Sequence, residues 1–99
     1  MIKRTPQRNR LKVRVQFSLA ETRVTSPEVS LVGEFNGWRQ GKTLMVPGDD
    51  GTRTASVTLE AGRRYAFSYV GDDGRWYDEE TADSAEPDGN GGWNSVLRT

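Results

Sequence analysis

The side chains most suited to ligand chemistry are three tryptophans that each lie beside a turn signal. Trp38 follows Asn36-Gly37, a dipeptide typical of tight turns because both residues tolerate a positive φ. Trp76 follows a run of Asp and Gly, and Trp93 follows a glycine-rich stretch. A single tryptophan at such a place most often closes the end of a sandwich, but three among nine aromatics favour an exposed binding surface.

Exposed indoles are suited to stacking. The face of a sugar ring and the face of a nucleobase can both stack on an indole, so the tryptophans alone do not decide the ligand. Asn94 and Arg75, each next to a tryptophan, could supply hydrogen bonds to sugar hydroxyls. We expect Trp38 and Trp76 to be more than half exposed on one face of one sheet, whereas Trp93 could instead cover the end of the sandwich.

Catalysis is not expected from this composition. The chain has no histidine and no cysteine, which removes the commonest general base, the commonest metal ligand and every thiol nucleophile. Glycoside hydrolysis needs two carboxylates held either about 5–5.5 Å or about 6.5–9.5 Å apart, whereas many of the acids here gather in one stretch where repulsion and solvation are expected. We therefore predict that the chain is not an enzyme and that it has no cofactor and no catalytic or metal site.

The net charge is zero, but the charges are segregated along the chain. Residues 1–23 hold seven basic side chains and one acidic one, and residues 72–88 hold eight acidic side chains and one basic one. The favoured interpretation is that the two segments attract each other, within one chain or between two copies. A basic arm that binds phosphates and a cation site in the acidic stretch are the alternatives, although that stretch lacks the spacing of a calcium loop. The cations expected near residues 78–88 are Arg8, Arg10, Lys12 and Arg14.

Alternation of apolar and polar residues predicts strands and no long helix. The clearest strand covers residues 11–19, and the aromatics expected in the core are Phe17, Tyr65, Phe67 and Tyr69. Short strands with turn signals every 8–12 residues are typical of an all-β antiparallel β-sandwich, here of six to eight strands. The predicted strands are residues 11–19, 28–33, 43–47, 54–60, 65–70, 75–77 and 94–98.

The chain is predicted to form one domain over residues 11–99, preceded by a flexible basic arm over residues 1–10. No apolar run approaches the ~20 residues of a transmembrane helix, and the first residues lack the apolar core of a signal peptide. Together with the absence of cysteine, this predicts a cytoplasmic protein without a membrane partner. A zero net charge offers no global attraction to nucleic acid and gives little repulsion between copies, so either a monomer or a weak dimer is expected.

Four motifs in order carry a resemblance to a known family. They are VGEFNGW (residues 32–38), the Y-x-F-x-Y strand (65–69), DGRW (73–76) and the terminal NSV (94–96). With them the chain resembles carbohydrate-binding module family 48, the Ig-like early-set domain of isoamylases and branching enzymes. That module is also the glycogen-binding domain of the AMP-activated protein kinase beta subunit. The similarity is greatest to small stand-alone bacterial members.

The resemblance implies a site for α-1,4-linked glucans. The family's two stacking tryptophans fall on Trp38 and Trp76, and its hydroxyl-binding asparagine falls on Asn94. Two positions depart from the family pattern. The basic residue usual in the strand before the DG-x-W motif is replaced by Ser68. The apolar residue of the loop before the final asparagine is missing near Asn90, where Trp93 is the adjacent candidate.

The expected function is therefore non-catalytic binding of an α-glucan, with a glycogen-metabolism enzyme as a further partner. The alternative is a protein-interaction or regulatory module that kept the fold and lost sugar binding. Nucleic-acid binding is disfavoured because the strands carry no RNP-type aromatic motif and the basic residues lie far in sequence from the tryptophans.

Overall fold

The strict alternation along residues 11–19 produces an inner strand of the first layer, β2 (Lys12–Leu19). In the computed structural model, which describes residues 1–8 and 10–99, every second side chain of β2 lies in the core. β5 (Arg53–Glu60) pairs with one edge of β2 and β1 (Ile2–Pro6) with the other, both antiparallel. In spatial order the strands of this sheet are β1 (Ile2–Pro6), β2 (Lys12–Leu19), β5 (Arg53–Glu60) and β4 (Val46–Pro47).

The second layer is more deeply buried than the first. All five positions of β3 (Val29–Gly33) and six of the eight positions of β6 (Arg64–Gly71) are buried, so both faces of these strands are covered. The short strand β7 (Trp76–Tyr77) pairs with the end of β6, where Trp76 lies opposite Val70. In spatial order the strands are β3 (Val29–Gly33), β6 (Arg64–Gly71), β9 (Trp93–Arg98) and β8 (Ser84–Pro87), with β7 (Trp76–Tyr77) beside β6.

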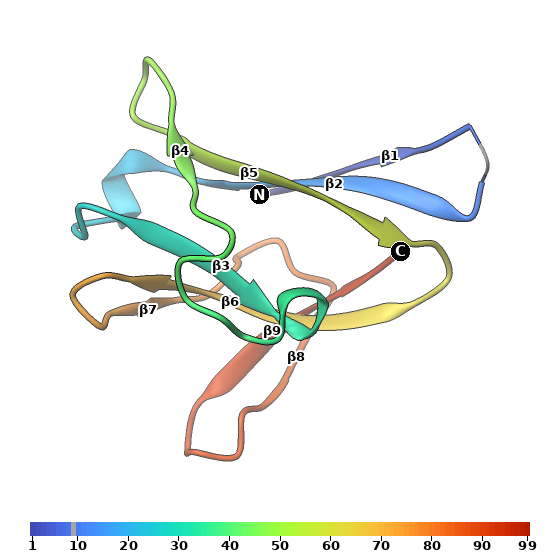
Figure 1. The fold of residues 1–99 in the computed structure, drawn as a ribbon. Coiled ribbons are helices and arrows are strands. Elements are labelled where there is room, and N and C mark those ends of the chain that lie inside the picture. The colour runs from blue at the N-terminus through green and yellow to red at the C-terminus, as the bar shows by residue number, and fades with distance from the viewer. Residues whose placement is uncertain (9) are drawn as a thin grey trace.

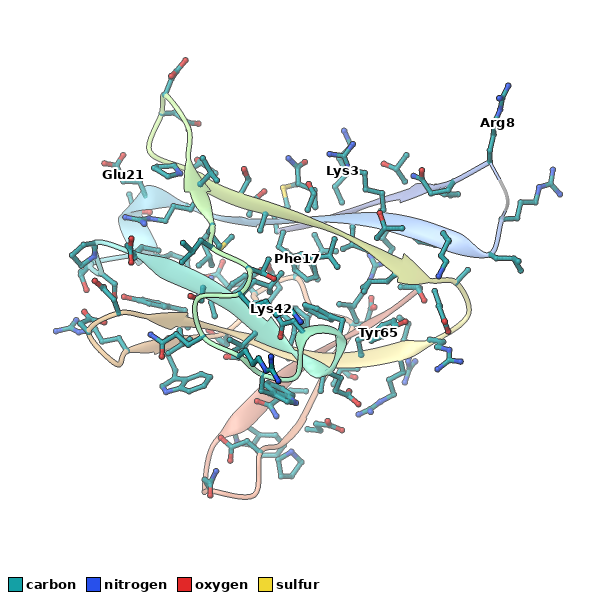
Figure 2. All side chains as sticks on the ribbon, in the orientation of Figure 1. Lys3, Arg8, Phe17, Glu21, Lys42 and Tyr65 are labelled. Atoms are coloured by element: carbon teal, nitrogen blue, oxygen red, sulfur yellow. The ribbon has the colours of Figure 1, made fainter. Side chains whose placement is uncertain are left out.

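The two sheets face each other and enclose the core (Figure 1). Phe17 lies between the layers, with its ring centroid 5.0 Å from that of Phe67 and 6.5 Å from that of Tyr69 (Figure 2). Both pairs are edge-to-face, a geometry that contributes about 0.5–1.5 kcal/mol beyond the burial of apolar area. These three aromatics are fully buried, as alternation predicts, and Tyr65 is partly buried.

The prediction of an all-β antiparallel sandwich is confirmed. The described residues form nine strands instead of six to eight, and their only helical segments are two 3-10 turns, η1 (Glu21–Arg23) and η2 (Glu34–Asn36). No helix in this part of the chain is long and apolar enough to cross a membrane. The two strands that were not expected are β1 and β8, which lie at the edges of their sheets.

The flexible arm predicted for residues 1–10 is a strand over Ile2–Pro6, so the prediction is wrong for these residues. β1 supplies hydrogen-bond partners to the backbone at the outer edge of β2, with Ile2 opposite Phe17. The side chain of Arg4 adds a further link, because its Nε donates to the carbonyl oxygen of Arg98 at 3.0 Å. Residue 9 of the predicted arm lies outside the described residues.

The basic and acidic segments meet within one chain. Arg4 Nη2 in β1 lies 2.5 Å from Asp83 Oδ2. In η1, Arg23 Nη2 lies 2.9 Å from Asp78 Oδ1, and Arg23 Nε lies 3.3 Å from Glu80 Oε1. The expected contact between the segments is therefore present, and it is made by Arg4, Arg23 and the N-terminal amino group, which pairs with Glu79; none of these is among the four cations that were named. Because most of the groups involved are solvated, each pair contributes only about 0–1 kcal/mol.

Candidate ligand-binding cleft

Strand alternation places Trp76 on the outer face of the second sheet. In β6, Phe67 and Tyr69 belong to the core between the sheets, so Ser68 and Val70 point to the opposite side. Trp76 lies directly opposite Val70 in an antiparallel pair, and residues paired in this way share one face of a sheet. Its indole therefore projects from the same outer surface as Ser68.

Trp38 is presented by a tight turn at the end of β3. Gly37 and Trp38 both adopt the left-handed conformation, with φ of 67° and 59°. Asn36 is buried and braces the turn: its Oδ1 accepts a hydrogen bond from Gly33 N–H at 3.0 Å, and its Nδ2 donates to Leu31 O at 2.8 Å. The left-handed conformation costs a residue with a side chain about 1–2 kcal/mol, and such strain is concentrated at functional sites.

The β8–β9 hairpin brings the third tryptophan. The hairpin projects from the second sheet, away from the first (Figure 1). Asp88 closes its turn, because Oδ1 accepts hydrogen bonds from the backbone N–H of Asn90 at 2.7 Å and of Gly92 at 3.0 Å. Trp93 and Asn94 follow immediately as the first residues of β9. Their positions are thus set by a turn that is internally hydrogen-bonded.

These three segments border one cleft of about 720 Å³. The volume lies within the ~300–1,000 Å³ typical of small-molecule sites. It belongs to the outer face of the second sheet, where Ser68 of β6 contributes to the lining. Within the described part of the chain, the lining residues are Trp38, Ser68, Trp76, Asp88, Asn90, Gly91, Gly92, Trp93 and Asn94.

The structure brings together four of the five predicted site residues. The exception is Arg75, whose side chain is held by the neighbouring loop and the turn before Trp76. Its Nη1 donates to Thr25 Oγ1 at 3.1 Å, and its Nε lies 3.6 Å from Asp73 Oδ2. The four that line the cleft are Trp38, Trp76, Trp93 and Asn94.

The tryptophans differ in how much of each residue is exposed. Trp76 is 63% exposed, as expected, but Trp38 is only 39% exposed and does not reach the predicted half. The tight turn explains the difference in part, because Trp38 N–H donates to Gly33 O at 3.0 Å and keeps the residue close to β3. Trp93 is 66% exposed and borders the cleft, so it does not serve as a cover for the sandwich end.

The lining offers stacking faces and neutral hydrogen-bonding groups. The amides of Asn90 and Asn94 provide both donors and acceptors, and among the described residues that line the cleft Asp88 is the only charged one. No group of three or more acidic side chains in the described part of the chain is placed to hold a metal ion. The cleft is therefore suited to a flat, polar ligand without charge.

Two residues that shape the site, Asp88 and Asn36, were not among the predicted site residues. Asp88 lines the cleft and closes the hairpin turn, and Asn36 braces the turn that carries Trp38. A signal for Asp88 was present, since an aspartate at the start of a glycine-rich turn commonly bonds its own backbone two residues on. Asn36 gave no comparable signal, because its partners lie in β3 and not in the turn.

No protein-family model matches this chain, and no curated protein matches it either.

Proposed function

We propose that this chain is a non-catalytic binding module for α-1,4-linked glucans such as glycogen, starch and maltooligosaccharides. The observation that carries the proposal is that three tryptophans and Asn94, separated by up to 56 positions in the sequence, border one cleft. The resemblance to carbohydrate-binding module family 48 supplies the ligand class. A cytoplasmic location and association with a glycogen-metabolism enzyme belong to the same proposal.

In the proposed mode of binding, the C–H faces of sugar rings stack on the indoles of Trp38 and Trp76. Asn94 exchanges hydrogen bonds with the hydroxyls at the ring edges. Trp93 takes the place of the apolar loop residue that the family pattern has near Asn90, which its exposure and its place beside the cleft support. Shape, and not charge, would select the ligand.

Such a site should be weak. Two stacks and a few hydrogen bonds, less the cost of association, correspond to a Kd between ~1 mM and ~1 µM, or about −4 to −8 kcal/mol. Because the ligand is neutral, the Kd should change little with salt concentration. A steep loss of affinity with rising salt would instead indicate phosphate contacts and favour a nucleic acid.

The test is sedimentation with insoluble starch or glycogen, with maltoheptaose or β-cyclodextrin as soluble competitor. We expect the protein to sediment with the polysaccharide and to be released by either competitor. The Trp76→Ala variant should lose at least ~10-fold in affinity, as expected for an aromatic anchor of a small site.

The Val46→Ala variant is the matched control, because Val46 is also 63% exposed but lies in β4, outside the cleft lining. It should bind like the parent protein. Absence of sedimentation by the parent protein, or equal binding by the Trp76→Ala variant, would overturn the proposal. Either result would favour a module that docks onto another protein through the same tryptophans.

A further inference from the structure

One serine in a loop is buried beneath the hairpin that carries Trp76. Ser26 lies between η1 and β3 and is only 2% exposed. Its hydroxyl donates to Asp73 Oδ1 at 2.6 Å and shares a hydrogen bond of 2.8 Å with the hydroxyl of Tyr77. Asp73 precedes Trp76 by three residues and Tyr77 follows it directly, so one hydroxyl joins both sides of the tryptophan.

The backbone of the β6–β7 hairpin packs directly against Ser26 at Gly71. A Cβ atom added to Gly71, at the end of β6, would lie 2.0 Å from Ser26 Oγ and 2.5 Å from Ser26 Cβ. Only glycine therefore fits at position 71 while Ser26 stays in place. The same loop also pairs with the turn through its backbone, because Asp72 N–H donates to Glu28 O at 3.0 Å.

The other side of the loop is fixed to the first sheet. Arg53 of β5 donates from Nη2 to Ser26 O at 3.0 Å and from Nη1 to Pro27 O at 2.8 Å. A continuous chain of hydrogen bonds thus runs from β5 through Ser26 to the residues on either side of Trp76. The Ser26 hydroxyl is also the largest influence that lowers the pKa of Asp73.

The Trp76 side chain has little support from packing. It belongs to a strand of only two residues, and 63% of it is exposed, so packing contributes little to holding its indole. Its orientation depends on the β6–β7 turn, and that turn is fixed to the body of the protein by Ser26 together with the Asp72–Glu28 and Arg75–Thr25 hydrogen bonds. An indole held in its bound orientation before binding loses less freedom when a ligand arrives, which increases affinity.

We propose that Ser26 is a positioning residue: without touching the ligand, it holds the β6–β7 turn so that the Trp76 indole is fixed in place for stacking. The effect on affinity rests on the proposed function, whereas the effect on Trp76 does not. Removing the hydroxyl leaves Asp73 and Tyr77 without their shared partner, and the turn then moves more freely relative to the cleft.

The test is fluorine NMR of the protein labelled with fluorotryptophan, with the three resonances assigned by Trp→Phe variants. In the Ser26→Ala variant we expect the Trp76 resonance to shift and broaden and the Trp93 resonance to stay unchanged. The Val13→Ala variant is the matched control. Val13 is 5% exposed and belongs to β2, where it pairs with Pro6 near the β1–β2 turn, at the opposite end of the sandwich from the β6–β7 turn (Figure 1). It should destabilise the fold without moving the Trp76 resonance.

An unchanged Trp76 resonance in the Ser26→Ala variant, or the same change in the Val13→Ala variant, would overturn the proposal. If the Ser26→Ala variant fails to fold, the Tyr77→Phe variant removes one of the two contacts and leaves Ser26 in place. It should move the Trp76 resonance in the same direction, and its failure to do so would equally overturn the proposal.

The affinity for β-cyclodextrin is a second measurement of the role of Ser26. We expect the Ser26→Ala variant to bind β-cyclodextrin about 3- to 10-fold more weakly than the parent protein, the range that corresponds to ordering one side chain on binding. Equal affinity in a parent protein that binds would overturn the positioning role. A parent protein that binds no glucan would overturn the proposed function, while the NMR result would still decide whether Ser26 positions Trp76.

Discussion

Asn36 shows how one buried amide can determine the place of an exposed indole. Its side chain is a partner of Gly33 N–H and Leu31 O, and its Nδ2 lies 3.2 Å from Thr43 Oγ1. The sequence suggested a turn with positive φ at Asn36 and Gly37, but the positive φ values fall on Gly37 and Trp38. The shift by one residue follows because the asparagine faces inward and belongs to η2.

The Asn36→Ala variant should therefore be strongly destabilised. It leaves a buried N–H and a buried carbonyl without a partner, and each such group costs about 1–3 kcal/mol. We expect the free energy of unfolding, measured with urea, to fall by about 2–4 kcal/mol. The Asn36→Asp variant retains the acceptor for Gly33 N–H but places a buried carboxylate oxygen against Leu31 O, so it should also be destabilised while the carboxyl is ionised. Equal stability of the Asn36→Ala variant and the parent protein would contradict the role of this residue.

At the scale of single elements, the hairpin between β8 and β9 carries one side of the cleft. Its turn is closed mainly by Asp88, whose carboxylate holds the backbone of Asn90 and Gly92. Around this turn Gly89 and Gly91 have φ near 85°, a conformation that glycine adopts at no steric cost. Without the aspartate, such a glycine-rich turn has few other restraints.

We expect the Asp88→Ala variant to loosen this hairpin with little change in overall stability. Amide hydrogen exchange at Asn90 and Gly92 should become faster, because both N–H groups lose their acceptor. The affinity for β-cyclodextrin should fall as the wall formed by Trp93 and Asn94 becomes mobile. In the Asp88→Asn variant the amide oxygen can accept the same bonds, so its exchange rates should resemble those of the parent protein. Unchanged exchange in the Asp88→Ala variant would contradict this account.

The strands divide into those that the sequence predicts and those that only the folded chain determines. β2, β5 and β6 correspond to strands predicted by alternation, because apolar side chains in period two can be buried on one face; β5 and β6 extend beyond the predicted bounds by one residue at one or both ends. β1 and β8 carry the sequences IKRTP and SAEP, which bury almost nothing and show no such pattern. They form because β2 and β9 offer unpaired edges, a cause that lies outside their own residues.

The same distinction applies to the cleft. Its tryptophans and Asn94 were predicted because their motifs are local. The loss of Arg75 from the site was not predictable, because Thr25 lies 50 positions away in the sequence and meets it only in the folded chain. The contacts of Ser26 with Asp73 and Tyr77 were not predictable for the same reason. In the sequence, a serine before a proline in a polar stretch is typical of an ordinary loop.

At the scale of the whole molecule, two buried groups make stability depend on pH. The Glu79 side chain is 1% exposed and accepts hydrogen bonds from the N-terminal amino group and from Tyr69. Burial acts to raise the pKa of Glu79, but bonds from the amino group, Thr81 and Tyr69 outweigh it, and the pKa is lowered. Burial, followed by the charge of Glu79, raises the pKa of Tyr69.

These shifts predict a loss of stability at both ends of the pH scale. A lowered carboxyl pKa favours folding above the unfolded value of about 4.3, and this contribution is lost as the pH falls through the folded value. A raised tyrosine pKa favours folding below about pH 10, and this contribution is lost as the pH rises beyond it. Both losses can be measured as a fall in the free energy of unfolding, determined with urea at about pH 3 and 10.5 and compared with the value at pH 7.

The Tyr69→Phe variant isolates the alkaline effect. It should be less stable than the parent protein near pH 7, because Glu79 loses a hydrogen bond, and the difference should narrow above about pH 10. The Glu79→Gln variant should flatten the acid side of the curve. A difference between the Tyr69→Phe variant and the parent protein that stays constant up to about pH 10.5 would show that Tyr69 does not control alkaline stability.

All three tryptophans of the chain border the cleft, and the buried aromatics of the core are phenylalanine and tyrosine. The protein's intrinsic fluorescence is therefore a signal from the cleft and not from the core. Trp76 and Trp93 are mostly exposed, so in the folded protein they should already emit at the long wavelengths of hydrated indole. Unfolding should therefore shift the emission maximum mainly through Trp38, which is 39% exposed. An occupant that displaces water from the indoles should shift the maximum to shorter wavelengths. The chain thus contains its own optical reporter of occupancy, and folding is better followed through the near-ultraviolet dichroism of its buried tyrosine.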